Sequence, residues 1–287
     1  MMTYQNILNK AVKQLEEAGI TEAALDARLM LMHVFNCDYQ FLLLHGNEEA
    51  EELLVKRYFA LVAERSKRIP LQHLTHCQNF MGFDFYVDEH VLIPRQDTEC
   101  LVEEAMLVTE DGMRVLDMCT GSGCILISLA CYKNEIEGVG IDLSEEALTV
   151  ARKNADTLFA GHSGQLTFLK SDLYDVLPES ELFDVIVSNP PYIRSDVIET
   201  LETEVKEHDP YMALDGGVSG LDFYEQITAK APDYLRAGGY LLYEIGFDQG
   251  EDVKKLMESH GFADVTIIKD LAGNDRVVKG RKRCLTN

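Results

Sequence analysis

The sequence predicts an α/β protein in which a small helical domain precedes a larger domain built on a doubly wound, mainly parallel sheet. Residues 3 to about 68 show helical patterns only, whereas after Thr98 short apolar runs alternate with amphipathic helices. That alternation is typical of parallel strands joined by helical crossovers. With 287 residues and 46% hydrophobic content, the chain can form a substantial core.

The first part of the chain is expected to be helical and to end in a hairpin. Helices are expected at residues 4–19, 21–35 and 48–68, with Thr21 as the N-cap of the second. Aromatic and β-branched residues around Gly82 are typical of a hairpin or of short strands that join two bodies. The expected parts are a helical domain at 1–72, a β-hairpin linker at 73–97 and the larger domain at 98–287.

In the larger domain the strand and helix patterns follow in a regular order. The runs expected to form strands are 113–117, 138–142, 166–170, 183–189, 263–270 and 274–281. Helical patterns are expected at residues 124–133 and 144–159, and the segments 224–246 and 248–261 follow before the final two strands. The carboxyl ends of such parallel strands share one edge of the sheet, where ligands bind.

Charge and cysteine content restrict the partners and the compartment. Lys and Arg total 26 against 49 Asp and Glu, a formal charge of -23, so we expect no stable nucleic-acid binding, and a basic protein partner fits better. The acidic N-terminal helix resembles neither a signal nor a transit peptide, and no apolar run approaches membrane-spanning length. The seven cysteines contain no CxxC pair, and no further ligands complete a metal site near Cys119 and Cys124. We therefore expect a reducing cytoplasm, no disulfide bonds and no bound metal. We expect a monomer.

A ligand loop is expected after the first strand of the larger domain. This strand ends at Asp117 and continues into "MCTGSGC", whose Gly121 and Gly123 allow a tight turn and close approach of a ligand. The next strand ends at Asp142, 21 positions beyond Gly121, where a carboxylate can bind ribose hydroxyls; Ser144 is the expected cap of the following helix. Asp172 closes the third strand and could receive an adenine amino group, or be an ordinary turn residue.

The loop chemistry favours one cofactor over another. A dinucleotide dehydrogenase could share the glycines and the acid, but the fingerprint here is GSGC, and no third glycine stands in register for GxGxxG. A cofactor without a pyrophosphate suits the loop better. The sequence therefore favours S-adenosylmethionine.

The fourth strand ends in "NPPY", residues 189 to 192, at the same sheet edge. A planar nitrogen is a poor nucleophile because its lone pair is delocalised, so its orientation is the problem to be solved. If the Asn189 side-chain oxygen and the Pro190 carbonyl each accept one N–H, the nitrogen is held toward the methyl donor and its developing charge is stabilised. Tyr192 can pack on the planar group. The alternative is a rigid turn with a buried tyrosine.

These residues closely resemble the protein-(glutamine-N5) methyltransferases that modify peptide chain release factors, the PrmC/HemK family. Besides "NPPYI", the likeness includes "RIPLQHLT", "VLIPRQDTE", "ALDGGVSGLDFY", "LLYEIGFDQG" and "KDLAGNDRVVKG", and it covers nearly the whole chain. "NPPY" alone is shared with DNA and RNA amino-methyltransferases and names a chemistry, whereas the flanking segments name the family.

The resemblance implies a seven-stranded class I S-adenosylmethionine-dependent methyltransferase (Rossmann-like) sheet with an antiparallel last strand, and a helical domain that recognises the substrate. It implies methylation of the glutamine of the Gly-Gly-Gln loop of bacterial class 1 release factors on its side-chain amide nitrogen, with S-adenosyl-L-homocysteine as the other product. The implied cofactor residues are Asp117, Thr120, Gly121, Ser122, Gly123, Asp142, Leu143, Asp172, Leu173 and Asn189. The implied substrate residues are Asn189, Pro190, Pro191, Tyr192 and Arg95, of which Asn189, Pro190 and Tyr192 are the catalytic ones.

The chain departs from the family pattern at three positions. The family usually has Gly in place of Cys119, Pro in place of Gln96 and Glu in place of Asp209; at Cys119 the Cβ is costly only if φ is positive.

Two other functions compete with this assignment. A nucleic-acid amino-methyltransferase, acting on adenine N6, cytosine N4 or guanine N2, is disfavoured by the acidic balance. A binding module without turnover is disfavoured because it would not need the amide clamp.

Overall fold

The structure is a computed structural model that describes residues 2–284. Contacts divide these residues into two compact units, one of residues 2–77 with 202–208, and the other of residues 78–201 with 209–284. The junction between Cys77 and Gln78 falls inside the expected 73–97 linker, and the short segment 202–208 was not expected to join the helices.

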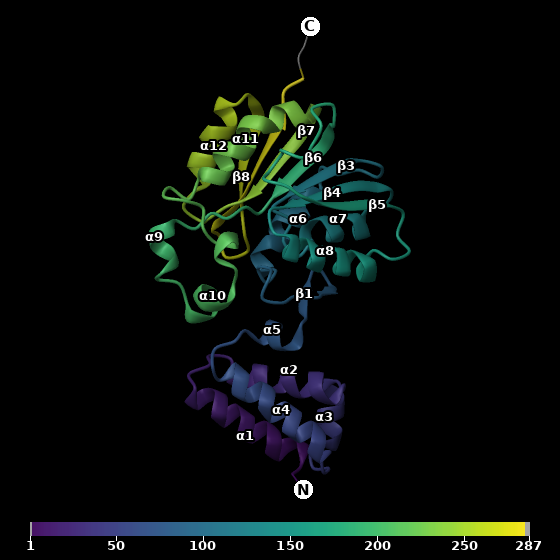
Figure 1. Ribbon diagram of the computed structural model, residues 1–287, viewed down its shortest axis with the longest axis vertical. Coiled ribbons are helices and arrows are strands. Elements are labelled where there is room, and N and C mark those ends of the chain that lie inside the picture. Colours follow the sequence, from purple (N-terminus) through teal and green to yellow (C-terminus); the bar gives the residue numbers. More distant parts are fainter. Residues whose placement is uncertain (1, 285–287) are drawn as a thin grey trace. The chain divides into compact units, whose positions relative to one another are not determined.

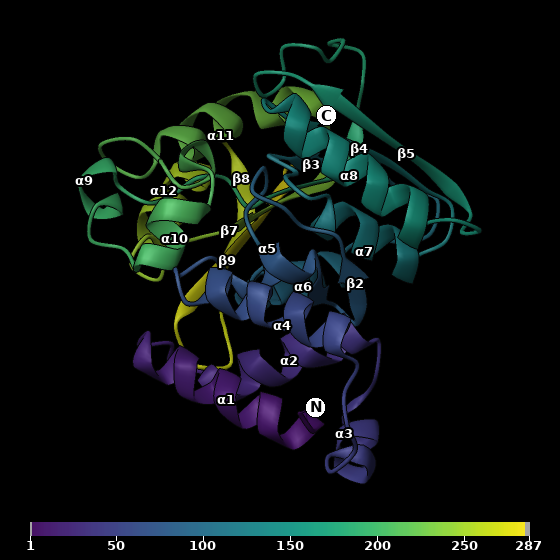
Figure 2. The ribbon, with the colours of Figure 1, turned by 60° about the horizontal axis from the view of Figure 1, so that its bottom comes forward.

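The helical unit has five helices from its N-terminal stretch. They are α1 (Tyr4–Glu17), α2 (Ala23–Phe35), α3 (Tyr39–His45), α4 (Glu52–Arg65) and α5 (Leu71–Thr75). Helix α1 lies alongside α2 and α4 (Figures 1 and 2), and the buried Ile7, Leu15, Leu31 and Val62 pack in their common core. The apolar periodicity of each helix thus forms one face of this core.

The start of α2 differs from the sequence expectation. The prediction of Thr21 as the N-cap is wrong, because the helix begins at Ala23 and Glu22 occupies the cap position without a side-chain cap. Helices α3 and α5 were not predicted. They are short, and Asp38 caps α3 by accepting from the Phe41 amide.

A buried ion-pair network joins residues 202–208 to this unit. Arg65 on α4 donates from Nε to Asp26 Oδ2 at 2.7 Å, and its Nη2 donates to both carboxylate oxygens of Glu204 at 3.0 and 3.1 Å. Glu204 lies in α10 (Thr203–His208). Arg65 and Asp26 are both nearly inaccessible, so each depends on the other for compensation of its charge.

The larger unit contains a seven-stranded sheet with the strand order β5-β4-β3-β6-β7-β9-β8. Its strands are β3 (Arg114–Met118), β4 (Ile136–Asp142), β5 (Gly164–Lys170), β6 (Phe183–Ser188), β7 (Leu235–Glu244), β8 (Phe262–Lys269) and β9 (Asp275–Lys282). β3 to β7 pair in parallel, and β9 inserts antiparallel between β7 and β8. The predicted fold class, including the antiparallel last strand, is confirmed.

Helices cover both faces of the sheet (Figure 1). One face packs against α6 (Glu99–Met106), α7 (Cys124–Tyr132) and α8 (Glu145–Leu158), and the other against α11 (Asp222–Tyr234) and α12 (Gly250–Ser259). Ser144 caps α8 through the Ala147 amide, as predicted. The short elements η1 (Gln96–Thr98), α9 (Ser195–Ile198) and η2 (Tyr211–Ala213) lie in the connections.

The expected hairpin around Gly82 is present as β1 (Gln78–Phe80) and β2 (Phe83–Phe85). Both turn residues, Met81 and Gly82, have positive φ (51° and 77°), the conformation of tight two-residue hairpins. Phe80 and Phe85 are fully buried in the core that contains α6 and α7. The hairpin is therefore packed into the larger unit.

Candidate active site

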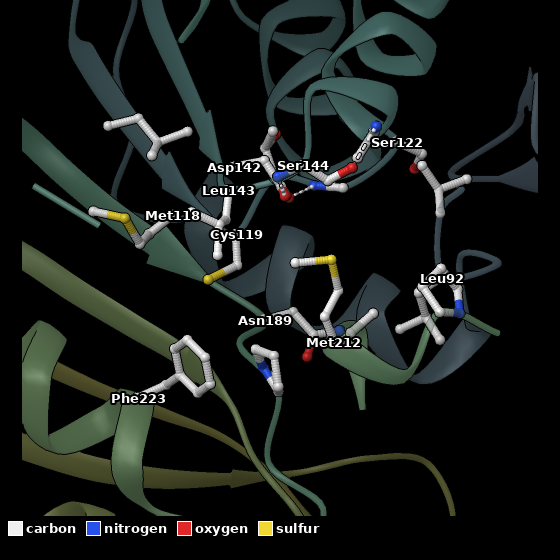
Figure 3. Close-up of a pocket in the computed structure, with 18 of the residues that line it drawn as sticks. Leu92, Met118, Cys119, Ser122, Asp142, Leu143, Ser144, Asn189, Met212 and Phe223 are labelled. Atoms are coloured by element: carbon white, nitrogen blue, oxygen red, sulfur yellow. Dashed lines mark hydrogen bonds between the residues drawn. The ribbon is translucent and has the colours of Figure 1, made fainter. Parts of the chain in front are cut away.

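A cavity of about 380 Å³ lies at the carboxyl edge of the sheet. The turns after β3, β4, β5 and β6 form its walls, together with residues from the stretches 90–98 and 210–215 (Figure 3). Strands β3 and β6 pair with each other. The sheet continues from β3 to β4 and β5 on one side, and from β6 to β7 on the other. The cavity therefore occupies the topological switch point, where open α/β sheets bind ligands.

The turn after β3 gives the cavity a wall of main chain. Gly121, with φ +53°, lines it and has open space where a Cβ would stand. Gly123, with φ +79°, does not line the cavity; a Cβ there would lie 2.8 Å from Ile127 Cδ1 and 3.2 Å from Ala151 Cβ. The first glycine leaves room for a ligand, and the second allows α7 and α8 to pack closely.

Cys119 begins this turn with φ +61°. A residue with a side chain in this left-handed region is strained by about 1–2 kcal/mol. Its side chain faces the cavity, next to that of Met118 (Figure 3). Burial, followed by the nearby Asp142 and Asp117 carboxylates, raises the pKa of the thiol, so Cys119 is a neutral wall residue.

Asp142 at the end of β4 holds the glycine turn. Its Oδ2 accepts the Gly121 amide at 2.9 Å, and its Oδ1 accepts the Ser144 amide at 2.9 Å. Burial raises the pKa of the carboxyl, while these backbone donors oppose the rise. Each oxygen has a further lone pair, so the carboxylate can still accept hydroxyl donors from a ligand in the cavity.

Asp117 stands behind the loop and does not line the cavity. It is fully buried, and the Thr120 hydroxyl donates to its Oδ2 at 2.6 Å. Burial raises the pKa of Asp117 to about 7, against the effect of the hydrogen bonds from Thr120 and the Leu126 amide. The structure therefore places Asp117 as a support for Thr120, whose own position is on the cavity wall.

The far wall of the cavity combines an acid with apolar side chains. Asp172, Leu143 and Leu173 line it, together with Ser122 on the loop side. Leu143 is 51% exposed, and Leu173 has φ +46°. The exposed Leu143 and the half-buried Leu173 can pack on a flat aromatic base, and the Asp172 carboxylate can accept a hydrogen bond from its amino group.

Asn189 directly follows β6 and lines the same cavity as the glycine turn. Its Nδ2 donates to Thr98 Oγ1 at 3.3 Å. Pro191 also lines the cavity, whereas Pro190 and Tyr192 do not. The Tyr192 hydroxyl instead donates to Glu244 Oε1 at 3.3 Å, and burial raises the pKa of Tyr192.

Arg95 lies on the cavity wall with its charge already compensated. Its Nη2 donates to Asp209 Oδ2 at 2.9 Å, and the Asp209 side chain is almost inaccessible. Asp209 precedes Pro210, which begins the lining segment 210–213. The pair therefore ties this segment to the wall that contains Arg95.

Three of the sequence motifs meet at Gln249 and Tyr192. Gln249 Nε2 donates to the carbonyls of Tyr192 (3.0 Å) and Gly220 (3.1 Å), and its Oε1 accepts the Gly246 amide at 2.9 Å. A Cβ on Gly216 would lie 2.7 Å from Tyr192 Cα. The segments "ALDGGVSGL" and "EIGFDQG" thus hold the main chain that follows Asn189.

Sequence reasoning missed several cavity residues. Leu92, Met212 and Phe223 line the cavity (Figure 3), as does Thr98. Leu92, Met212 and Phe223 lie within or beside motif segments, but no local pattern shows that they face the ligand.

Within residues 2–284, none of the helices combines the length and the hydrophobicity that a membrane-spanning segment requires. This part of the chain also has no group of three or more His, Cys, Asp or Glu side chains that could hold a metal ion.

The chain is similar to known proteins along nearly its whole length. The family model described as the PrmC N-terminal domain matches residues 6–75, and a methyltransferase domain model matches residues 109–261. The chain is 38% identical over 280 residues to a release factor glutamine methyltransferase of Clostridium acetobutylicum, covering 96% of this chain and 98% of that protein. It is 40% identical over 281 residues to one of Geobacter sulfurreducens, covering 97% and 96%.

A solved structure shares the fold. The methyltransferase from Pyrococcus furiosus superimposes with a TM-score of 0.55 and 20% identity, covering 77% of this chain and 100% of that one.

Proposed function

This chain belongs to the release factor glutamine methyltransferase family, and from that premise we propose the reaction and its residues. The protein is an S-adenosylmethionine-dependent methyltransferase. It methylates the side-chain amide nitrogen, N5, of the glutamine in the Gly-Gly-Gln motif of bacterial class 1 peptide chain release factors. One observation carries the assignment: Asn189 lines the same cavity as Gly121 and Asp142.

The cavity suits S-adenosylmethionine. Gly121 leaves open space above the turn, Asp142 retains lone pairs for ribose hydroxyls, and Asp172 with Leu143 can receive the adenine. Thr120, Ser122 and Leu173 complete the binding residues, while Asp117 and Gly123 hold the turn from behind. When bound there, the cofactor supplies an electrophilic methyl group on a sulfonium.

The chain orients the substrate amide. The Asn189 side-chain oxygen and the Pro190 carbonyl each accept one N–H of the glutamine, which aims the nitrogen lone pair and stabilises its developing charge. Pro191 fixes the main chain, Tyr192 supports it through Glu244, and Arg95 borders the entrance of the substrate. No general base is needed before attack, because the proton becomes acidic only when the nitrogen has gained the methyl group.

The partner and compartment follow from charge and cysteines. The formal charge of -23 supports a protein substrate rather than nucleic acid, and we propose that the enzyme acts in the cytoplasm, where its seven thiols stay reduced.

The decisive experiment uses methyl-labelled S-adenosylmethionine with a bacterial release factor and with a Gln→Ala version of its Gly-Gly-Gln loop. Label located by peptide mass spectrometry on the glutamine of the intact factor, and nowhere on the variant, is the expected result. No label on either factor, with cofactor binding confirmed by calorimetry, would contradict the substrate assignment and direct the search to nucleic acids.

A further inference from the structure

One buried side-chain amide close to the cofactor turn has no role in the reaction assigned above. Asn154 lies on α8, is 2% exposed and does not line the cavity. Burial of an amide is costly unless its donors and its acceptor are hydrogen-bonded. The partners of Asn154 therefore show what this side chain holds.

Three hydrogen bonds join the Asn154 side chain to the main chain of two segments that are distant in the sequence. Its Oδ1 accepts the Tyr86 amide at 2.8 Å. Its Nδ2 donates to the Tyr86 carbonyl at 3.0 Å and to the Ser122 carbonyl at 2.9 Å, so both amide protons are used. A reversed amide would set its NH₂ against the Tyr86 N–H and its oxygen against two carbonyls. Only one orientation of Asn154 therefore satisfies these partners.

The two segments supply different walls of the cavity. Ser122 belongs to the turn after β3 and lines the cavity (Figure 3). Tyr86 directly follows β2 and begins the stretch that contributes His90, Leu92 and Arg95 to the lining. The amide that holds the Ser122 carbonyl is thus the same amide that holds the start of the other wall.

Apolar contacts also place this second segment on α8. Val87 and Val91 are buried in a small cluster with Ala147 and Val150 of the helix. Apolar packing is not directional, so it keeps the segment on the helix without fixing its position along the helix axis. The directional hydrogen bonds of Asn154 supply that position.

We propose that Asn154 is a positioning residue for the cofactor, because its bonds to the Ser122 carbonyl and the Tyr86 main chain set the spacing between the turn after β3 and the wall at residues 90–95. Without the amide the two walls can separate, and a ligand must restore their spacing when it binds. The inference rests on the proposed function in one respect, that this cavity binds S-adenosylmethionine. It does not depend on which substrate receives the methyl group.

The first test is S-adenosylmethionine binding to the full chain, measured by calorimetry without a release factor. Asn154→Ala should raise the dissociation constant at least about tenfold, since the cofactor must then order the walls itself. Asn154→Asp keeps the shape of the side chain and the acceptor for the Tyr86 amide, but it places an oxygen against the two carbonyls. At pH 8 this variant should bind the cofactor at least as weakly as Asn154→Ala.

Leu158→Ala is the matched control for lost stability. Leu158 is half-buried at the end of the same helix and does not line the cavity. Its truncation should lower the midpoint of thermal unfolding, as Asn154→Ala does, yet leave the dissociation constant within about threefold of wild type. A dissociation constant that is unchanged in both Asn154 variants, or raised equally in Leu158→Ala, would overturn the inference.

Turnover with a release factor separates cofactor binding from chemistry. Asn154→Ala should raise the KM for S-adenosylmethionine at least about tenfold and keep kcat at saturating cofactor within about threefold of wild type. The reason is that the amide organises the cofactor walls and does not contact the reacting atoms. A lowered kcat with an unchanged KM would contradict this role.

Hydrogen exchange tests the connection in the wild-type protein. The Tyr86 amide donates to Asn154, and Tyr86 does not line the cavity. Saturating S-adenosylmethionine should nevertheless slow the exchange of this amide at least about threefold in wild type, and it should not do so in Asn154→Ala. An amide that exchanges equally fast with and without cofactor in wild type would overturn the inference. A wild type that shows the expected protection but does not methylate a release factor would contradict only the proposed substrate.

Discussion

Asp142 Oδ2 lies 2.9 Å from the backbone nitrogen of Gly121, so the residue that closes β4 also fixes the turn that follows β3. Two adjacent strands therefore present one preformed surface to a ligand, because the acid and the glycine cannot move independently. The ligand does not have to order the loop, which lowers the entropic cost of binding.

Asp142→Ala should weaken S-adenosylmethionine binding at least tenfold, about 1.4 kcal/mol or more, because both the ribose acceptor and the support of Gly121 are lost. Isothermal titration calorimetry measures this. Asp156→Ala, an exposed acid on α8, is the control and should bind normally. An unchanged dissociation constant in Asp142→Ala would remove Asp142 from the cofactor site.

Asn189→Ala should leave the cofactor dissociation constant within about threefold of wild type and lower kcat by about 10² to 10⁴. The amide acts on the substrate nitrogen, so its loss affects the transition state more than cofactor binding. Asn47→Ala, in an exposed turn, should have normal turnover. Retention of nearly full turnover would show that the amide clamp is not part of the mechanism.

Cys119 provides a test of backbone strain. The backbone at Cys119 has φ +61°, in the left-handed region. The Cys119→Gly variant should therefore be about 1 kcal/mol more stable than Cys119→Ala, because glycine has no Cβ and is not strained in this conformation. At Cys131, inside α7, the same pair should have the opposite order, since alanine is favoured in a helix. Urea unfolding of the four variants checks both; the same order at the two positions would refute the strain.

Asp117 predicts a pH-dependent stability. Its pKa is raised in the folded state from 3.8 to about 7, so its contribution to stability is full below pH 3.8 and is lost as the pH rises to about 7. Asp117→Asn removes this dependence and should be more stable than wild type at pH 8 by up to about 4 kcal/mol. Urea unfolding at pH 5 to 8 should show the difference shrinking toward acid. A difference independent of pH would show that Asp117 is not protonated on folding.

Breaking the buried Asp26–Arg65 ion pair should strongly destabilise the helical unit. Asp26→Asn leaves a buried guanidinium with one carboxylate fewer and should lower the free energy of unfolding by about 3 kcal/mol. The matched control is Glu52→Gln, which breaks the exposed Glu52–Lys56 pair and should cost less than 1 kcal/mol. Equal costs in thermal unfolding would mean that Arg65 is adequately compensated by Glu204 alone.

The sheet was predictable because its information is local. The strands β3, β4 and β6 are apolar runs with a polar residue at or next to their ends: Asp117 is the last but one residue of β3, Asp142 is the last residue of β4 and Asn189 directly follows β6. Parallel topology brings such ends to one edge, so neighbouring strands could be expected to share a ligand.

The remaining features depend on contacts between distant residues. The sequence could not show that Asp117 turns away from the cavity, because Thr120 and the start of α7 decide its direction. Thr98 and Asn189 are 91 positions apart, and their hydrogen bond exists only in the folded chain. The N-cap prediction at Thr21 was wrong because α2 starts at Ala23, and Glu22 occupies the cap position without a side-chain hydrogen bond.

The path of the chain around α10 has a consequence for dissecting the protein. The main chain leaves the larger unit after Leu201 and returns to it at Asp209, so the two units share three covalent junctions instead of one. Removing residues 2–77 alone would deprive Glu204 of its ion pairs with Arg65 and Arg68, which tie 202–208 to the helical unit. Isolating the larger unit therefore requires two changes to the chain: removal of residues 2–77, and replacement of residues 202–208 by a short designed connection between Leu201 and Asp209.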